Sequence, residues 1–121
     1  MAAFWIETTV HRDRTRLAVI GELDLEAAPF LTDIGLSSLS EPSTRLVVID
    51  LAKVTFMNSA ALAALLRLRD AAEDMNKALV LSRLPERVRK LLSVTALDPV
   101  FVEVAHEPGA AIVRPPVIQA A

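Results

Sequence analysis

The sequence has no cysteine, only two histidines and only three glycines, and each shortage excludes a class of site. Without cysteine the chain forms no disulfide, thiolate nucleophile or cysteine-based zinc site. Neither His11 nor His106 has a second candidate ligand at a metal-binding spacing, so we expect no metal. The glycines are isolated at positions 21, 35 and 109 and cannot form a phosphate-binding loop. We therefore expect no cofactor.

Charge and hydropathy argue against two further classes. The 13 basic and 15 acidic residues give a net charge of −2, whereas a protein that binds nucleic acid through its phosphates carries a basic surplus. The most apolar segment, residues 46–66, is interrupted by Asp50, Lys53 and Asn58, so no stretch approaches the roughly 20 apolar residues that span a bilayer. The first residues show no secretory signal pattern. We expect neither nucleic acid nor membrane insertion, and a cytoplasmic location.

Hydrophobic residues make up 53% of the chain, which is enough for a folded core. The length and the small number of glycine and proline residues predict one domain over residues 4–105. The remainder, residues 106–121, contains Pro108, Pro115 and Pro116 and is expected to be a loose C-terminal tail.

Hydrophobic periodicity predicts two strands followed by alternating helices and strands. The polar patch 11–14 is expected to be the turn of an antiparallel hairpin, and residues 53–57 a connector. The expected strands are 4–10, 15–20, 45–51, 77–81 and 100–104, and the expected helices are 25–39, 60–76 and 84–93. Strands that alternate with helices form parallel sheets through right-handed crossovers. The predicted fold is α/β, a mixed, mostly parallel β-sheet opened by a hairpin, with three to four helices.

The helix expected over 60–76 carries an apolar stripe. At about 100° per residue, its core face is predicted to contain Ala61, Leu65, Leu68, Ala72 and Met75. Leu66 is expected among solvent-facing residues, with Leu62 between the two zones. Together with Ala63 and the segment 57–59, these two leucines would form a small apolar patch, either a docking surface or an incidental one.

Ser59 stands where a buried strand passes into this helix. Its hydroxyl could serve as the N-cap, worth about 1 kcal/mol, although Asn58 is an equally good cap. Alternatively, Ser59 could be phosphorylated, because a helix N-terminus tolerates an added charge of about −1.5 to −2. Ser59 is not surrounded by the Gly-x-Ser-x-Gly motif of a catalytic serine. The acidic pairs at 22/24 and 73/74 could act as acid and base, but nothing distinguishes them from solvated surface charges. We expect no catalytic residues and no enzyme.

Residues 46–62 resemble the signature of STAS domains, the family of bacterial anti-sigma factor antagonists. That family shows an aliphatic strand ending in Asp-Leu, a short connector, and Phe-x-Asp-Ser-(Ser/Thr)-Gly-Leu at the start of a helix. Residues 21–24 match its Gly-Glu-Leu-Asp segment, and residues 84–92 resemble its third helix. The chain departs from the signature at three positions, with Asn58 for Asp, Ala60 for Ser or Thr, and Ala61 for Gly.

The resemblance implies a bacterial regulator of transcription that works by partner switching. In that family the unphosphorylated antagonist binds an anti-sigma factor of the ATP-using kinase type and so releases the sigma factor. The kinase phosphorylates the motif serine, which weakens binding, and a serine phosphatase resets the switch. Carried to this chain, the phosphorylation site is Ser59. The implied partner-binding residues are Asp24, Asn58, Ser59, Ala60, Ala61, Leu62 and Leu66.

Two other functions remain open on the sequence. The chain could be a constitutive STAS interaction or scaffold subunit, attached to a transporter or a signalling assembly, that binds without a phosphorylation switch. The replaced Asp and Gly of the motif favour this alternative. The chain could also bind a small ligand or nucleotide, because parallel sheets bind ligands beyond the carboxyl ends of their strands. The lack of a glycine-rich loop counts against the nucleotide.

Overall fold

The computed structural model describes residues 4–104, and these form five strands and three α-helices. In chain order the elements are β1 (Phe4–His11), β2 (Arg14–Leu23), α1 (Ala28–Ser40), β3 (Leu46–Met57), α2 (Ser59–Asp74), β4 (Ala78–Ser82), α3 (Glu86–Val94), the short 3-10 helix η1 (Asp98–Val100) and β5 (Val102–Val104). The predicted mixed α/β fold with its opening hairpin is confirmed. The expected domain end at Ala105 and the tail at 106–121 lie outside the described residues.

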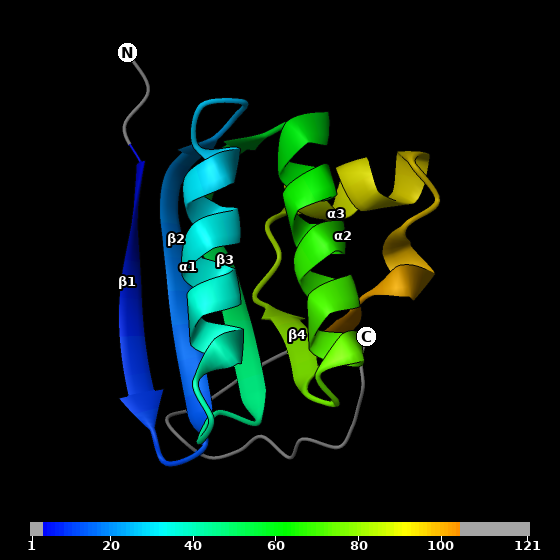
Figure 1. The fold of residues 1–121 in the computed structure, drawn as a ribbon. Coiled ribbons are helices and arrows are strands. Elements are labelled where there is room, and N and C mark those ends of the chain that lie inside the picture. The colour runs from blue at the N-terminus through cyan, green and yellow to red at the C-terminus, as the bar shows by residue number, and fades with distance from the viewer. Residues whose placement is uncertain (1–3, 105–121) are drawn as a thin grey trace.

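One sheet contains all five strands, in the order β1-β2-β3-β4-β5. β1 runs antiparallel to β2, and every other pair of neighbours is parallel. The helices α1, α2 and α3 lie in the connections between the parallel strands. β2 and β3 run in the same direction and both end at the top of Figure 1, whereas the shorter β4 ends beside the middle of β3, where Ser82 pairs with Asp50. Both α1 and α2 also begin at this end.

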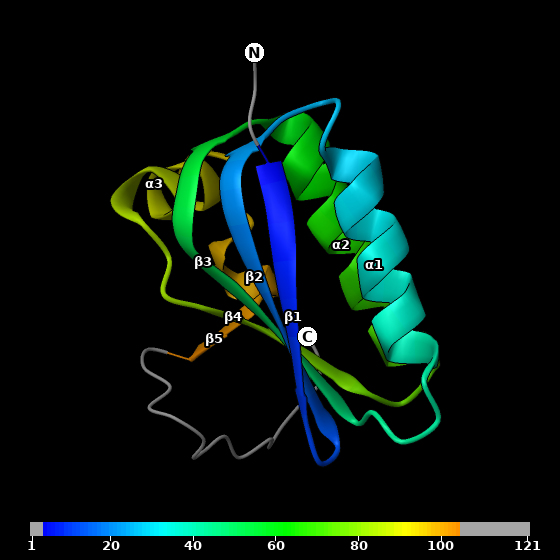
Figure 2. The same cartoon turned by 90° about the vertical axis from the view of Figure 1, so that its left-hand side faces the viewer.

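The position of the helices determines which face of the sheet holds the main core. Figures 1 and 2 show α1 and α2 side by side over one face. Val47 and Ile49 of β3 are fully buried in the cluster that includes helix residues. Leu46 and Val48 alternate with them and form a smaller cluster with Val80 of β4. Within residues 4–104, no helix contributes to this smaller cluster, so it marks the other face of the sheet.

β3 is longer than the sequence predicts, because the expected connector at 53–57 is part of the strand. It pairs with β2 as far as Met57, which lies opposite Leu23. Two register shifts interrupt this pairing, one of them next to Gly21, whose φ is 106°. Such irregularities break the alternation of buried and exposed side chains, so this polar segment resembles a loop in sequence. The added residues carry the strand directly to the start of α2.

The core face of α2 largely follows the prediction. The stripe residues that are buried are Ala61, Leu65, Leu68 and Ala72. The prediction was wrong for Met75, which is exposed because the helix ends at Asp74. Leu66 is half-buried and packs against the core, and Leu62 is buried, in the same cluster as Val88 of α3. The apolar patch expected from these two leucines is therefore largely internal.

The two helices α1 and α2 approach each other closely at Gly35, which is buried. A Cβ atom at Gly35 would lie 2.6 Å from both Cδ atoms of Leu68, so the missing side chain permits this contact. Toward their N-terminal ends, the helices face each other across small side chains and leave a groove.

Candidate functional site

Two polar residues meet where β2 and β3 end. Leu23 and Met57 are register partners in this parallel pair, and neighbouring strands lie about 4.8 Å apart. Asp24 and Asn58 are the next residues along the chain, so they lie side by side at this end of the sheet. Residues that are 34 positions apart in sequence are thereby brought to one surface.

Asp24 holds the turn that leads into α1. Its Oδ1 accepts hydrogen bonds from the backbone N–H groups of Glu26, at 3.1 Å, and Ala27, at 3.0 Å. A carboxylate in this role shapes the loop and remains at its surface, since Asp24 is only half-buried.

Asn58 is the N-cap of α2. Its backbone is extended, with φ −128° and ψ −170°, and its Oδ1 accepts from the N–H groups of Ala60, at 3.1 Å, and Ala61, at 3.4 Å. This satisfies two of the four backbone donors that a helix leaves open at its start. Asn58, and not Ser59, is therefore the cap that the sequence left undecided.

Ser59 is the first residue of α2, and its side chain is exposed. Its hydroxyl makes no hydrogen bond with any residue in 4–104. Because the capping is done by Asn58, the fold does not depend on this hydroxyl. A group added to Ser59 Oγ would point to solvent and leave the cap in place.

Replacing the two junction residues should separate their roles. We expect Asn58→Ala to lower the free energy of unfolding by about 1 kcal/mol, because two N–H groups lose their acceptor. Ser59→Ala should change it by less than about 0.5 kcal/mol, since no hydrogen bond is lost. Chemical denaturation of both variants measures the difference, and Asn58→Asp, which keeps an acceptor oxygen, is the matched control. A larger loss for Ser59→Ala than for Asn58→Ala would contradict this assignment.

The predicted partner-binding residues divide into surface and core. Asp24, Asn58 and Ala60 are half-buried and Ser59 is exposed, so these four share the surface at the start of α2. Ala61 is fully buried and Leu62 is nearly so, and both belong to the main core. Leu66 lies a turn further along and packs against that core.

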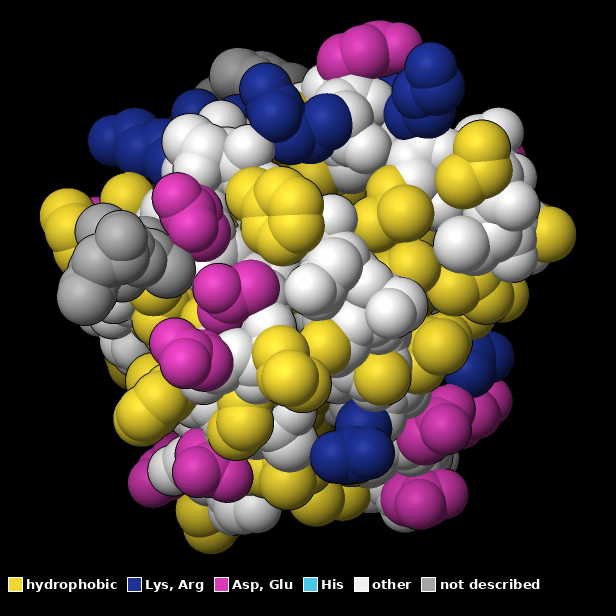
Figure 3. Space-filling model, turned by 90° about the horizontal axis from the view of Figure 1, so that it is seen from above, with side chains coloured by type: hydrophobic (Ala, Val, Ile, Leu, Met, Phe, Trp, Pro, Cys, Tyr) yellow, Lys and Arg dark blue, Asp and Glu magenta, His cyan; other side chains and the backbone are white. Residues whose placement is uncertain are grey.

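Three exposed apolar side chains around this surface were not predicted from sequence. Leu25 is 72% exposed, Phe30 is 61% exposed, and Phe56 is 45% exposed. Figure 3 looks onto this end of the molecule and shows hydrophobic side chains across its centre, with charged side chains mainly around the edge. Asp24 could have signalled the exposure of Leu25: its carboxylate holds a turn before the helix, so α1 begins at Ala28, three residues later than expected, and Leu25 lies in that turn.

A buried ion cluster lies away from this surface, on the face of the sheet opposite α1 and α2. Asp50 of β3 accepts hydrogen bonds from Arg16 of β2 and from Arg83 after β4, the latter through Nη2 at 2.5 Å and Nε at 3.3 Å. Burial raises the pKa of Asp50, but hydrogen bonds from Arg83 and from the Ala52 N–H, together with both positive charges, outweigh it. The pKa therefore lies below its ordinary value.

Within residues 4–104, no three His, Cys, Asp or Glu side chains come close enough to hold a metal ion. No helix in the same part of the chain is long and apolar enough to cross a membrane.

Comparison with known proteins identifies the family of this fold. The sequence profile described as "Mlab, STAS domain" matches residues 6–103. An anti-sigma-B factor antagonist of Staphylococcus epidermidis is 32% identical over 92 residues, which are 76% of this chain and 84% of the relative. This chain belongs to the STAS domain family. The resemblance inferred from the motif around Ser59 is thus confirmed.

Solved STAS structures share the fold at lower identity. The anti-sigma factor antagonist SpoIIAA in its unphosphorylated form aligns with a TM-score of 0.71 and 21% identity, covering 87% of this chain and 90% of its own. Phosphorylated SpoIIAA of Bacillus aligns with a TM-score of 0.66 and 20% identity, over 87% and 94% of the two chains. An anti-sigma factor antagonist from Mycobacterium paratuberculosis aligns with a TM-score of 0.69 and 24% identity, covering 84% of this chain and 85% of its own.

The departures of this STAS domain from the family signature are compatible with its fold. Asn58 caps α2 with the same kind of oxygen that an aspartate would supply. The methyl group of Ala61 is fully buried among core side chains, where it adds packing. What changes is the charge beside Ser59, because an amide replaces the usual carboxylate.

Proposed function

We propose that this chain is an anti-sigma factor antagonist that works by partner switching. The unphosphorylated form binds an anti-sigma factor of the ATP-using kinase type, and phosphorylation of Ser59 weakens that binding. The observation that carries the proposal is the exposed Ser59 hydroxyl, which has no hydrogen-bond partner within residues 4–104 and lies at the surface beside Asp24 and Asn58. The name of the Staphylococcus epidermidis relative supports the same function.

The electrostatics of the surface suit such a switch. Asp24 and the exposed Glu26 already make the neighbouring loop acidic, and a phosphate would add about −1.5 to −2 charges beside it. A partner that fits the unmodified surface would then face both steric bulk and a charge that it was not built to pair. Since Asn58 keeps the helix capped, the modification acts on binding and not on folding.

Phosphorylation itself provides the direct test. The purified chain is incubated with ATP and, one at a time, with each purified ATP-binding anti-sigma factor encoded in the same genome. We expect one of them to add a single phosphate, seen by intact mass and mapped by peptide sequencing to Ser59. Ser59→Ala should take up none. Absence of phosphate with every kinase, or a phosphate that maps to another serine, would overturn the switch.

A second candidate is a constitutive STAS interaction subunit that binds its partner without a switch. The observation that favours it is the neutral Asn58 next to Ser59, because a kinase that recognises the usual carboxylate would lose that contact. This candidate predicts a stable complex that resists ATP, with Ser59 unmodified. Adding ATP to a preformed complex distinguishes the two candidate functions, because the switch predicts that the partner is released and the constitutive subunit predicts that it stays bound.

A further inference from the structure

A groove of about 310 Å³ lies between the N-terminal halves of α1 and α2. Its walls are mainly small and apolar, and its polar residues come from both helices. The lining residues are Leu25, Ala28, Pro29, Thr32, Asp33, Ala60, Ala63, Ala64 and Arg67. The groove therefore begins at Ala60, the residue that follows the proposed phosphorylation site.

The groove exists because of the side chains on the two facing helices. At Gly35 the helices touch through Leu68, whereas toward their N-terminal ends several of the facing residues are alanines, among them Ala28, Ala60 and Ala64. Ala63 is exposed, and Leu25, which lines the groove, is 72% exposed. An enclosed apolar cavity of about 150 Å³ already takes a benzene-sized group, so this groove has room for a large side chain.

Two opposite charges flank the groove. Asp33 comes from α1 and Arg67 from α2, and both are exposed. Neither makes an ion pair with any residue in 4–104. An occupant that carries a basic group toward α1 and an acidic group toward α2 would complement them, and such rim charges favour one orientation of docking.

We propose that this groove is the anchor pocket for the anti-sigma factor, which inserts one large apolar side chain between α1 and α2 with a basic and an acidic residue on either side. The inference rests on the proposed function and adds the part of the surface that carries most of the binding energy. Interfaces typically concentrate their energy in a few side chains that fill such pockets. A partner anchored here would lie directly against Ser59, so a phosphate would stand at the mouth of its pocket.

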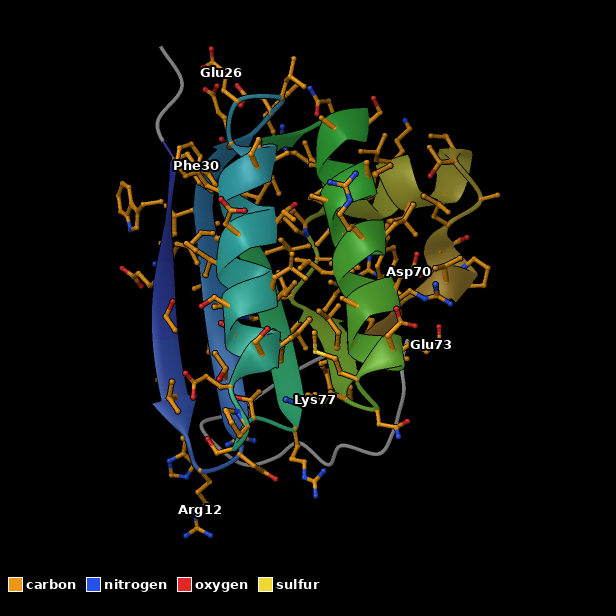
Figure 4. All side chains as sticks on the ribbon, in the orientation of Figure 1. Arg12, Glu26, Phe30, Asp70, Glu73 and Lys77 are labelled. Carbon is orange, nitrogen blue, oxygen red and sulfur yellow. The ribbon has the colours of Figure 1, made fainter. Side chains whose placement is uncertain are left out.

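Filling the groove tests the anchor. We expect Ala63→Trp to weaken binding of the anti-sigma factor by about 30-fold, the loss typical of a blocked anchor site. Glu73→Trp is the matched control, because Glu73 is exposed on the same helix at its far end (Figure 4). Binding is measured by calorimetry against the same panel of purified anti-sigma factors, with thermal unfolding to verify each variant. Ala63→Gln, a milder change, serves if the tryptophan variant does not fold.

The possible outcomes distinguish a failure of the groove proposal from a failure of the proposed antagonist function. If wild type and Glu73→Trp bind one panel member and Ala63→Trp does not, the anchor is supported. Equal binding by all three chains would overturn the anchor and leave the antagonist function standing. Failure of the wild-type chain to bind any panel member would overturn the function itself. A dimer in wild type that Ala63→Trp dissociates would assign the groove to a second copy and also overturn the proposal.

Charge reversal at Asp33 or Arg67 should slow association more at low salt than at high salt.

Discussion

Ser59→Asp is expected to lower the affinity of this chain for its anti-sigma factor by two to three orders of magnitude. In the proposed complex the partner closes over a hydroxyl that is exposed and unpaired within residues 4–104, beside the acidic loop at Asp24. Two like unit charges about 4 Å apart repel by about 4 kcal/mol at an effective dielectric constant near 20. That energy corresponds to nearly three decades of affinity, and residual solvent at the interface reduces it somewhat.

Two control variants make this result specific. Ser59→Ala should bind within a few-fold of wild type, because it removes a hydroxyl that makes no internal hydrogen bond. Ser43→Asp places the same charge on an exposed residue of the loop that joins α1 to β3, at the other end of the molecule, and should bind normally. Titration calorimetry with the purified anti-sigma factor gives the affinities. Equal binding by Ser59→Asp and Ser59→Ala would count strongly against the switch.

Combining Asn58→Asp with Ser59→Asp places a carboxylate at both residues of the junction. The amide at Asn58 is neutral and the first turn of α2 has no acidic residue, so in the proposed switch the phosphate adds the first negative charge at this helix start. Restoring the carboxylate would place two acidic groups at one helix start, where the N-terminal end of the helix offsets part of their repulsion.

The sequence contained enough information for the order of the elements but not for the length of β3. Periodicity distinguishes strands from helices over 45–51 and 60–76 because each has a face that must be buried. Residues 53–57 lack that regularity, since β2 and β3 shift register twice before Met57. Only the backbone pairing with β2, which joins residues far apart in the chain, makes this segment a strand.

The site was only partly accessible from sequence for a related reason. The motif located Asn58 and Ser59, but both are good caps, and the choice depends on backbone angles that neighbouring elements impose. Ala61 and Leu62 are buried in a core that also contains residues of β2, α1, β3 and α3, so their burial depends on elements far from them in sequence. The groove between α1 and α2 requires two helices to be positioned side by side, which no local pattern encodes.

The buried carboxylate of Asp50 should make a large contribution to stability. Its side chain is 5% exposed, while those of Arg16 and Arg83 are 25% and 48% exposed. The cluster joins β2, β3 and the segment after β4, so it fixes the centre of the sheet on the face opposite α1 and α2. Removing both arginines would leave a negative charge inside the protein, where the Ala52 N–H is the one remaining hydrogen-bond donor to it among residues 4–104.

We therefore expect Arg16→Gln with Arg83→Gln to lower the free energy of unfolding at pH 7 by about 3 kcal/mol, the low end for breaking a buried ion pair because solvent reaches both arginines. Asp50→Asn should cost less, about 1 to 2 kcal/mol, since it leaves no buried charge.

The pH dependence distinguishes a charge effect from lost packing. The pKa of Asp50 is lowered in the folded state relative to the ordinary value of 3.8. Its contribution is thus fully present above that value and is lost as the pH falls through the folded-state pKa. The stability difference between wild type and Asp50→Asn should be constant from about pH 5 to 7 and shrink below about pH 4. Urea unfolding of both proteins across this range measures it, and a difference that stays constant down to pH 2.5 would show that Asp50 acts through its shape and not through its charge.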